Sequence, residues 1–166
     1  MYLGLESGSN EVLRRVHKEA TAAEMVDAVQ KAKRAGIRVS VIAILGLGGT
    51  ELSLHHAEET GRAVSAMDPE YLSMLTLMLV PGTELYQQWR SGTFMLPEPV
   101  ELLHELRHVV AHTNDLSRCI FRTNHASNYL PLEGTLSRDK ARLLAAIDEA
   151  LDRGPSVLRP EAWRAL

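Results

Sequence analysis

The residues best placed to do chemistry stand near the start of the chain, in the stretch Gly4–Asn10. Glu6 is the only acid of an apolar segment and stands where a strand is expected to end. Gly4 and Gly8 permit backbone geometry that a side chain would hinder, and Ser9 can cap a following helix by accepting an N–H bond. A strand, a tight turn and a helix in that order can present Glu6 to a ligand. The alternative interpretation is a solvated acid beside an ordinary helix cap.

Two further glycine-containing corners follow apolar segments. Residues 37–47 form a nearly continuous apolar run rich in β-branched residues, which is typical of a parallel strand covered on both faces. It leads into Gly46–Thr50 and then a helical pattern, with Thr50 as the expected cap. A third apolar run, Tyr71–Val80, ends in Pro81–Glu84 and another helical pattern. Ligands of parallel sheets bind at the carboxyl ends of the strands, so all three corners are expected on one edge.

Histidines and the single cysteine do not predict a metal site. His104 and His108 are four residues apart on an expected helix, but no HExxH pattern and no third ligand accompany them. His55 and His56 diverge because they are adjacent on a helix, and they are predicted to be surface residues. One cysteine, Cys119, excludes an internal disulfide and any site with several cysteine ligands.

A polar stretch, Arg122–Tyr129, follows a short expected strand at Ile120–Phe121. It predicts either the lining of a substrate cavity or a surface loop with Asx-type turns, and the two interpretations have equal support. In the first, His125 is a candidate catalytic group, a proton donor or acceptor.

Composition limits the classes of function. The chain has 166 residues, of which 45% are hydrophobic and 23% charged, and its net charge is −3. These values are typical of one globular domain, and they indicate no nucleic-acid surface. No apolar run reaches the roughly 20 residues of a membrane span, and the start of the chain has no basic region of a secretory signal. A cytoplasmic location is therefore expected.

The pattern of elements predicts an α/β fold: strand–helix three times, then a tail. Such alternation is typical of a parallel sheet with right-handed crossovers. We expect one unit at residues 1–95 and a mostly helical tail at 96–166 packed on it. Helices are expected in the tail at Val100–Thr113 and from Ser137 onward.

These motifs, taken in order, resemble radical S-adenosylmethionine (radical SAM) enzymes, close to the branch of tRNA methylthiotransferases and oxygen-independent coproporphyrinogen oxidases. In that family the matching segments are the fourth, fifth and sixth strands of a partial (β/α)6 barrel, a TIM-like fold. The resemblance covers roughly residues 2–90. The segments that carry it are Gly4–Ser9, Val16–Lys18, Ile44–Gly49 and Val80–Tyr86.

The resemblance implies roles for individual residues toward S-adenosylmethionine. Glu6 matches the family's ligand of the ribose hydroxyls, with Ser7 beside it to assist. Lys18 stands where relatives carry an arginine that pairs with the methionine carboxylate; a lysine keeps the charge and loses the bidentate fork. Gly46 matches the glycine that lets the fifth strand approach the adenosine, and Pro81 would border the adenine.

The family's Cys-x3-Cys-x2-Cys loop is absent, and Cys119 alone cannot hold a [4Fe–4S] cluster, which takes three thiolates in this family. The chain therefore looks like the C-terminal half of such an enzyme: a truncated gene, a misplaced start codon or an expressed fragment. Half a barrel also leaves an unpaired edge strand near Met1–Leu5, which favours self-association.

Three functions remain open at this point. In the first, the chain is part of an enzyme that generates a 5′-deoxyadenosyl radical and acts on an unknown substrate, with the cluster held by the missing half. In the second, it is a catalytically inactive remnant. In the third, it is an unrelated nucleotide-binding module that holds phosphate at Gly46–Thr50, although neither GxGxxG nor Gly-Lys-Ser/Thr is present.

Overall fold

The computed structural model describes residues 1–165, which form an α/β fold built on a five-stranded sheet in the order β1-β2-β3-β4-β5. Strands β1 to β4 are parallel to one another, and β5 runs antiparallel to β4. Each parallel step needs a crossover, and helices supply all three. The strands are β1 (Tyr2–Glu6), β2 (Ser40–Leu45), β3 (Tyr71–Thr76), β4 (Ile120–Arg122) and β5 (Glu133–Thr135).

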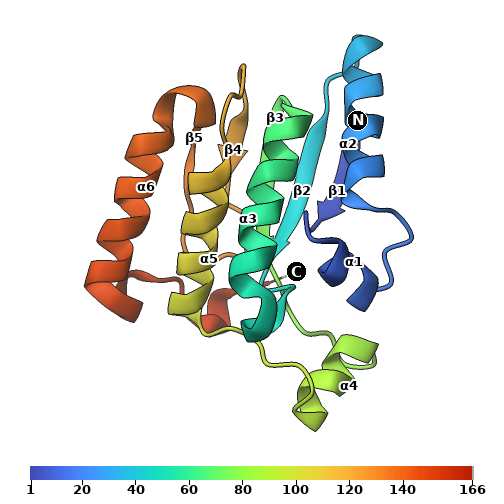
Figure 1. Cartoon of the computed structure of the whole chain (residues 1–166). Coiled ribbons are helices and arrows are strands. Elements are labelled where there is room, and N and C mark those ends of the chain that lie inside the picture. The colour runs from blue at the N-terminus through green and yellow to red at the C-terminus, as the bar shows by residue number, and fades with distance from the viewer. Residues whose placement is uncertain (166) are drawn as a thin grey trace.

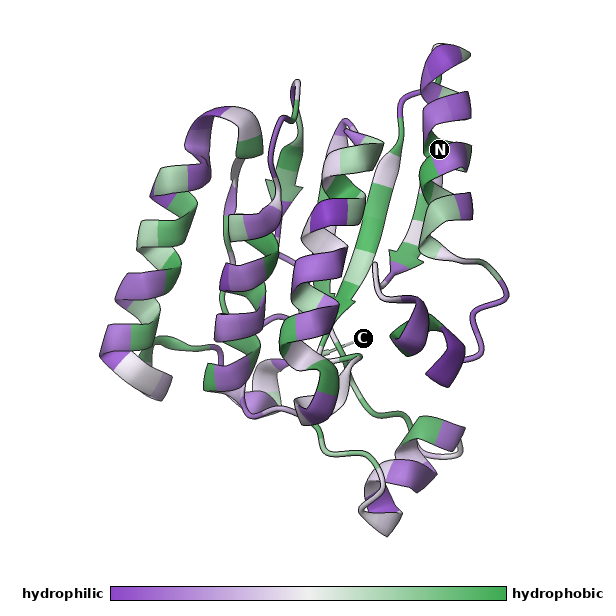
Figure 2. Ribbon diagram, in the orientation of Figure 1, coloured by the Kyte–Doolittle hydropathy of each residue, from purple (hydrophilic) through white to green (hydrophobic). Residues whose placement is uncertain are grey.

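Helices α2, α3, α5 and α6 stand side by side along one face of the sheet (Figure 1). Their apolar sides turn toward the strands and their polar sides turn outward (Figure 2). The helices are α1 (Asn10–Arg15), α2 (Ala22–Arg34), α3 (Gly49–Met67), α4 (Glu84–Ser91), α5 (Pro99–His112) and α6 (Leu136–Arg153), followed by two 3-10 turns, η1 (Gly154–Val157) and η2 (Glu161–Trp163).

The two faces of the sheet differ in burial. Val41, Ala43 and Leu45 of β2 are at most 3% exposed and pack under the helices. The alternating residues Ile42 and Ile44 point to the other face and are only partly buried. Within residues 1–165, helices therefore cover one face of the parallel strands, and the expectation of two covered faces was wrong.

Local signals placed most helix starts correctly. A side-chain oxygen accepts a backbone N–H bond at each of three helices, and α2 carries the complete capping box expected from its sequence. The three capping residues are Ser9, Thr21 and Thr83.

Two helix starts differ from the prediction. Helix α3 begins at Gly49 with Gly48 as its N-cap, so Thr50 lies inside the helix. The helix therefore begins two residues before the start that a Thr50 cap predicts, and Gly49 has φ +60, a conformation that glycine adopts readily. Helix α6 begins at Leu136, and Ser137 does not cap it. Instead the carboxylate of Asp139 accepts the N–H of Thr135 at 2.8 Å, which does the work of a cap.

The tail adds strands to the sheet. The short strand expected at Ile120–Phe121 is present as β4 and pairs in parallel with β3. Strand β5 was not expected, because its three residues, Glu133–Thr135, show no apolar alternation. In the described part of the chain, no helix is both long and apolar enough to cross a membrane.

Candidate functional site

The polar corners meet at one edge of the sheet, as the sequence predicts. Strands β1, β2 and β3 are parallel neighbours, so the turns that follow them share the carboxyl edge. The polar stretch after β4 joins the same edge, because β4 is also parallel to β3. In Figure 1 this edge lies at the lower end of the sheet, where α1 and α4 also lie.

Glu6 and Lys18 are brought together at this edge. Glu6 has φ 59, an uncommon conformation for a residue with a side chain, and its carboxylate turns back over Gly4. A Cβ on Gly4 would meet that carboxylate, so a side chain there would displace the Glu6 carboxylate from its present position. The Lys18 ammonium donates to the Gly4 carbonyl at 2.9 Å and lies 3.4 Å from Glu6 Oε1. The two side chains are 26% and 32% exposed, so both charges remain within reach of a ligand.

Ser7, beside Glu6, is fully buried and points away from that edge. Its hydroxyl lies 2.7 Å from Nδ1 of His56, and Nε2 of His56 lies 3.1 Å from the Ile44 carbonyl. A carbonyl can only accept, so Nε2 carries the hydrogen and Nδ1 accepts from Ser7. The Ser7 oxygen in turn accepts the N–H of Ser9 at 3.0 Å. One histidine on α3 therefore holds the corner after β1 against the end of β2.

Glu105 on α5 completes this buried cluster. Its two carboxyl oxygens each accept a bond at 2.5 Å, one from the Gly46 N–H and one from the Ser53 hydroxyl. Oε1 also lies 3.5 Å from Nε2 of His56. Ser7 and His56 thus form one hydrogen-bonded pair, Ser53, Glu105 and the Gly46 amide form a second hydrogen-bonded set, and the 3.5 Å contact places the two side by side beneath the corners.

Burial sets the protonation states of His56 and Glu105. Loss of solvent lowers the pKa of His56 to about 4 and raises the pKa of Glu105 to about 7. His56 is therefore neutral at pH 7, in agreement with the bonding of its two nitrogens. The 3.5 Å contact joins a neutral imidazole to a carboxyl group and is not an ion pair at that pH.

The prediction that His56 lies on the surface was wrong, and Glu105 was not considered at all. His56 lies four residues before the buried Thr60 on the inner side of α3. Glu105 lies three residues after Leu102 and four before Val109, both buried on α5. These spacings put both polar residues on core-facing sides of their helices, which is the signal that could have found them.

The glycine corner after β2 faces the helices. Gly46 has φ +82, and a Cβ there would lie 2.9 Å from Leu102 Cδ2. Its lack of a side chain is thus explained by the left-handed backbone and by contact with α5. Pro81, in the loop after β3, is exposed. Of the sequence-predicted cofactor residues, the structure therefore brings Glu6 and Lys18 into contact and leaves Pro81 apart on the loop.

The stretch after β4 is anchored onto β3. The Asn128 amide accepts from the Thr76 hydroxyl at 2.9 Å and donates to the Met74 carbonyl at 2.8 Å. The Ser127 hydroxyl accepts the Thr76 N–H at 3.2 Å. His125 is exposed, with Nδ1 2.9 Å from the Ser127 hydroxyl. The stretch thus combines a buried anchor with an exposed histidine at the rim, and a catalytic role of His125 stays a prediction.

Arg164 locks the end of the chain over this stretch. Its guanidinium donates to the carbonyls of Ser127 at 2.7 Å and Leu77 at 3.1 Å, and lies 4.1 Å from the Tyr129 ring centre. It also pairs with Glu161 at 2.7 Å. Although charged, it is only 9% exposed, because five-donor geometry lets it satisfy several carbonyls at once. Sequence reasoning missed this residue, since its partners are distant in the chain.

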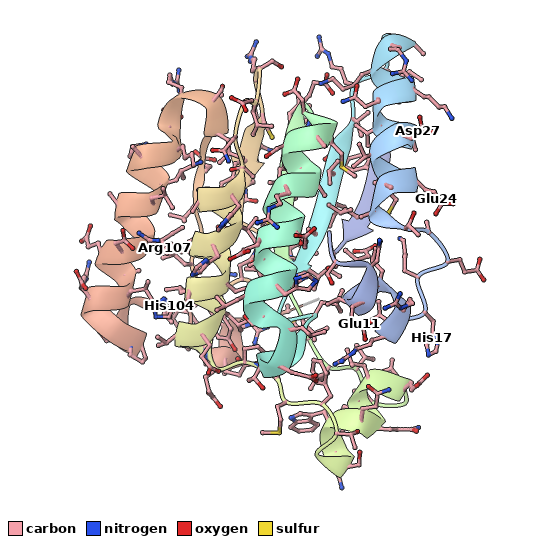
Figure 3. All side chains as sticks on the ribbon, viewed as in Figure 1. Glu11, His17, Glu24, Asp27, His104 and Arg107 are labelled. Atoms are coloured by element: carbon pink, nitrogen blue, oxygen red, sulfur yellow. The ribbon has the colours of Figure 1, made fainter. Side chains whose placement is uncertain are left out.

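A cleft of about 370 Å³ lies beside the β2 corner, between α1 and α4. His17, which is labelled in Figure 3, follows α1, and its Nε2 lies 3.1 Å from Glu84 Oε2 of α4. Leu47 and Gly48 line the cleft, whereas Glu6 and Lys18 do not. Its other principal lining residues are Arg14, Arg15, Leu85 and Phe94.

The described residues do not fit an iron–sulfur cluster. Residues 1–165 contain no group of three or more His, Cys, Asp or Glu side chains placed to hold a metal ion. Cys119 is buried, and burial raises the pKa of its thiol to about 12, so it is not a thiolate at neutral pH. A cluster would need ligands from another polypeptide segment.

No family model matches the chain, whereas a curated protein and several solved structures resemble it. The chain is 27% identical over 94 residues to a tRNA uridine(34) acetyltransferase of Methanocaldococcus infernus. The match covers 55% of this chain and 17% of the relative, so the chain spans about a sixth of that protein.

One of the solved structures is the archaeal Elp3 of the same organism, determined with residues 1–46 deleted. It superposes with a TM-score of 0.64 at 18% identity, over 89% of this chain and 35% of that structure. At this identity the likeness concerns the fold. This chain therefore has the fold of about a third of Elp3, a parallel half-barrel covered by helices, as its sequence predicts.

Proposed function

We propose that this chain is the second half of a radical SAM barrel and that it binds S-adenosylmethionine at the carboxyl edge of β1–β3. The observation that carries the proposal is the shared fold with Elp3, a radical SAM superfamily member, together with sequence similarity to a protein of the same type. The finer placement near methylthiotransferases and coproporphyrinogen oxidases stays a prediction. A cytoplasmic location belongs to the same proposal.

Glu6 and Lys18 are the residues with suitable chemistry and exposure. A carboxylate can accept both hydroxyls of a ribose, and an ammonium can pair with a carboxylate of the cofactor. Both groups stand at the edge where parallel sheets bind ligands. When bound to a reduced cluster, S-adenosylmethionine supplies a 5′-deoxyadenosyl radical in this family. The cluster ligands lie outside this chain, and the chain's own part is to bind and orient the cofactor.

Ser7, Gly46 and Pro81 have different parts in the proposal. The Ser7 hydroxyl is bonded to His56 and fully buried, so Ser7 positions the Glu6 turn instead of contacting the cofactor. Gly46 has no side chain to offer the cofactor, and its N–H is already bonded to Glu105, so its part is to fix the backbone of the corner after β2. Pro81 is exposed on the loop after β3 and can border an adenine ring.

A catalytically inactive remnant is the second candidate function. It is favoured by the lack of cluster ligands among the described residues. It predicts the same fold, so the two candidates differ only in whether the cofactor edge still binds. The relative is named for action on tRNA, but this chain spans 17% of it, so tRNA is not part of the proposal.

Calorimetric titration of S-adenosylmethionine into the chain tests the proposal. We expect saturable binding, and we expect Glu6→Gln to lower affinity about ten- to a hundredfold, the value of roughly 1.5–3 kcal/mol for a hydrogen bond to a charged group. The matched control is Glu19→Gln, which removes an exposed acid on the segment after α1. Saturable binding that both variants leave unchanged would exclude Glu6 as a ligand. Absence of binding to the unmodified chain would favour the remnant.

A further inference from the structure

A hollow of about 260 Å³ opens on the face of the sheet that no described helix covers. It lies at the amino ends of the strands, the opposite edge from Glu6 and Gly46. Its polar and aromatic lining residues are Tyr2, Arg38, Ser40, Tyr71, Ser73 and Arg122.

The strand register places these side chains next to one another. Ser40 of β2 pairs with Tyr71 of β3, and Ser73 of β3 pairs with Arg122 of β4. Paired residues on adjacent strands point to the same face and stand about 5 Å apart. Ser40, Tyr71 and Ser73 therefore occupy neighbouring positions on one face of the sheet, with Arg122 at their side.

Three arginines surround this part of the sheet. Arg38 and Arg122 line the hollow, and Arg118 lines an adjoining one of about 240 Å³ that shares Arg38 and Tyr71. All three are exposed, and within residues 1–165 none has a side-chain hydrogen bond or an ion pair. By contrast, Arg14, Arg15, Arg62, Arg107, Arg138 and Arg153 each pair with an acid on the surface.

Few acids oppose these charges. Glu70 lines the adjoining hollow, where its carboxylate accepts the Val39 N–H at 2.7 Å. Glu133 stands opposite Arg122 on β5 and lines neither hollow. Counting Arg38, Arg118 and Arg122 against these two acids leaves an excess of positive charge.

We propose that this hollow binds a phosphate group carried by a small molecule. A guanidinium presents a planar fork of N–H donors that matches phosphate oxygens, and neighbouring hydroxyls add donors. Arg38 and Arg122 supply the charge, and Ser40, Ser73 and Tyr71 supply the hydroxyls. This site is separate from the edge proposed for S-adenosylmethionine, so it stands or falls independently.

NMR titration of the 15N-labelled chain with pyrophosphate, at ionic strength held constant with sodium chloride, tests the site. We expect saturable shifts of the amides of β2, β3 and β4 near Ser40, Ser73 and Arg122. Arg38→Gln and Arg122→Gln should each weaken binding about tenfold, the effect of losing one charge-assisted bond. Both arginines are exposed, so the variants are expected to fold.

Arg90→Gln is the matched control, because Arg90 is an exposed arginine on α4, far from the hollow along the fold. It should leave the affinity for pyrophosphate unchanged. An equal loss in all three variants would show that pyrophosphate responds to net charge, and would overturn the proposal. Tighter binding of malonate than of pyrophosphate would overturn the assignment to phosphate.

Discussion

Nε2 of His56 lies 3.5 Å from Oε1 of Glu105, and neither side chain reaches solvent. This contact places the Ser7–His56 hydrogen bond next to the Gly46–Glu105 hydrogen bond. The conformation of the two corners at the proposed cofactor edge thus depends on two residues of the helix layer behind them.

Removal of the imidazole should therefore weaken the whole fold. His56→Ala leaves the Ser7 hydroxyl and the Ile44 carbonyl without their partner and opens a cavity, and we expect a loss of about 2–4 kcal/mol in the free energy of unfolding. Urea denaturation measures it. The control is His55→Ala, its exposed neighbour, which should change the value by less than about 0.5 kcal/mol. Similar values for the two variants would contradict the assigned bonds.

The buried pair should also shape stability as a function of pH. The pKa of Glu105 is about 7 in the fold against an ordinary 4.5, so between these values the unfolded chain releases a proton that the fold retains. The free energy of unfolding then falls as pH rises through that window, by about 3 kcal/mol for Glu105 alone. The pKa of His56 is about 4 against an ordinary 6.5, so its contribution rises with pH between those values. The two contributions oppose each other.

Single substitutions should separate these contributions. Glu105→Gln keeps the shape; its amide oxygen can accept the Gly46 N–H while its NH2 group donates to the Ser53 hydroxyl. We expect it to gain stability relative to the unmodified chain as pH rises from 4.5 to 7. His56→Ala should show its largest deficit near pH 7 and a smaller one near pH 4.5. Urea midpoints measured every half pH unit give both slopes, with Glu19→Gln as the exposed-acid control. Parallel pH profiles for all four proteins would refute the shifted pKa values.

Gly46 tests the packing of the corner against α5. Gly46→Ala combines a positive φ with a contact at 2.9 Å to Leu102, and we expect a loss of about 2–3 kcal/mol. Gly82 also has a positive φ, +91, but a Cβ there meets nothing within 4 Å. Gly82→Ala should therefore cost only the backbone strain, about 1 kcal/mol. Thermal or urea unfolding of the two variants would contradict the packing argument if it gave equal losses.

Anaerobic iron–sulfur reconstitution should give no stable cluster on this chain. Cys119 is buried, with a thiol pKa of about 12, and no second cysteine exists. The measurement is the visible absorption of an iron–sulfur cluster in the protein fraction after gel filtration. Cys119→Ala, treated in the same way, serves as the control and should give the same background. A stoichiometric signal lost only in Cys119→Ala would show that the thiol does bind iron.

Local signals in the sequence were enough for the elements of the half-barrel and for their order. Ser9, Thr21 and Thr83 each cap a helix through the residue three positions later, so their role depends on few other parts of the chain. The shared edge of the corners follows from the parallel arrangement. Leu54 shows the limit of the same reasoning: it is spaced on α3 to share a face with the buried Ala57 and Val64, yet it is 57% exposed.

The parts that could not be predicted depend on distant partners. His56 meets Ser7 from 49 residues away, and Gly46 meets Glu105 from 59. Arg164 reaches the Leu77 carbonyl across 87 residues. A buried polar residue is explained only by its partners, and sequence spacing names none of them. Glu6 and Lys18 are only 12 residues apart, across one turn and one helix, so a short sequence motif can include both.

The two edge strands of the sheet, β1 and β5, differ in how many backbone groups they leave free to pair with another strand. At β5, the Thr135 N–H is taken by Asp139 at 2.8 Å and the Glu133 carbonyl by Arg142 at 2.9 Å, so few backbone groups are left for another strand. At the other edge, β1 pairs only with β2 among the described residues. Another strand can therefore be added only at β1. When two copies pair through their β1 strands, neither copy has a free edge left. Association by this route ends at a closed, two-fold pair, and sedimentation should find no polymer.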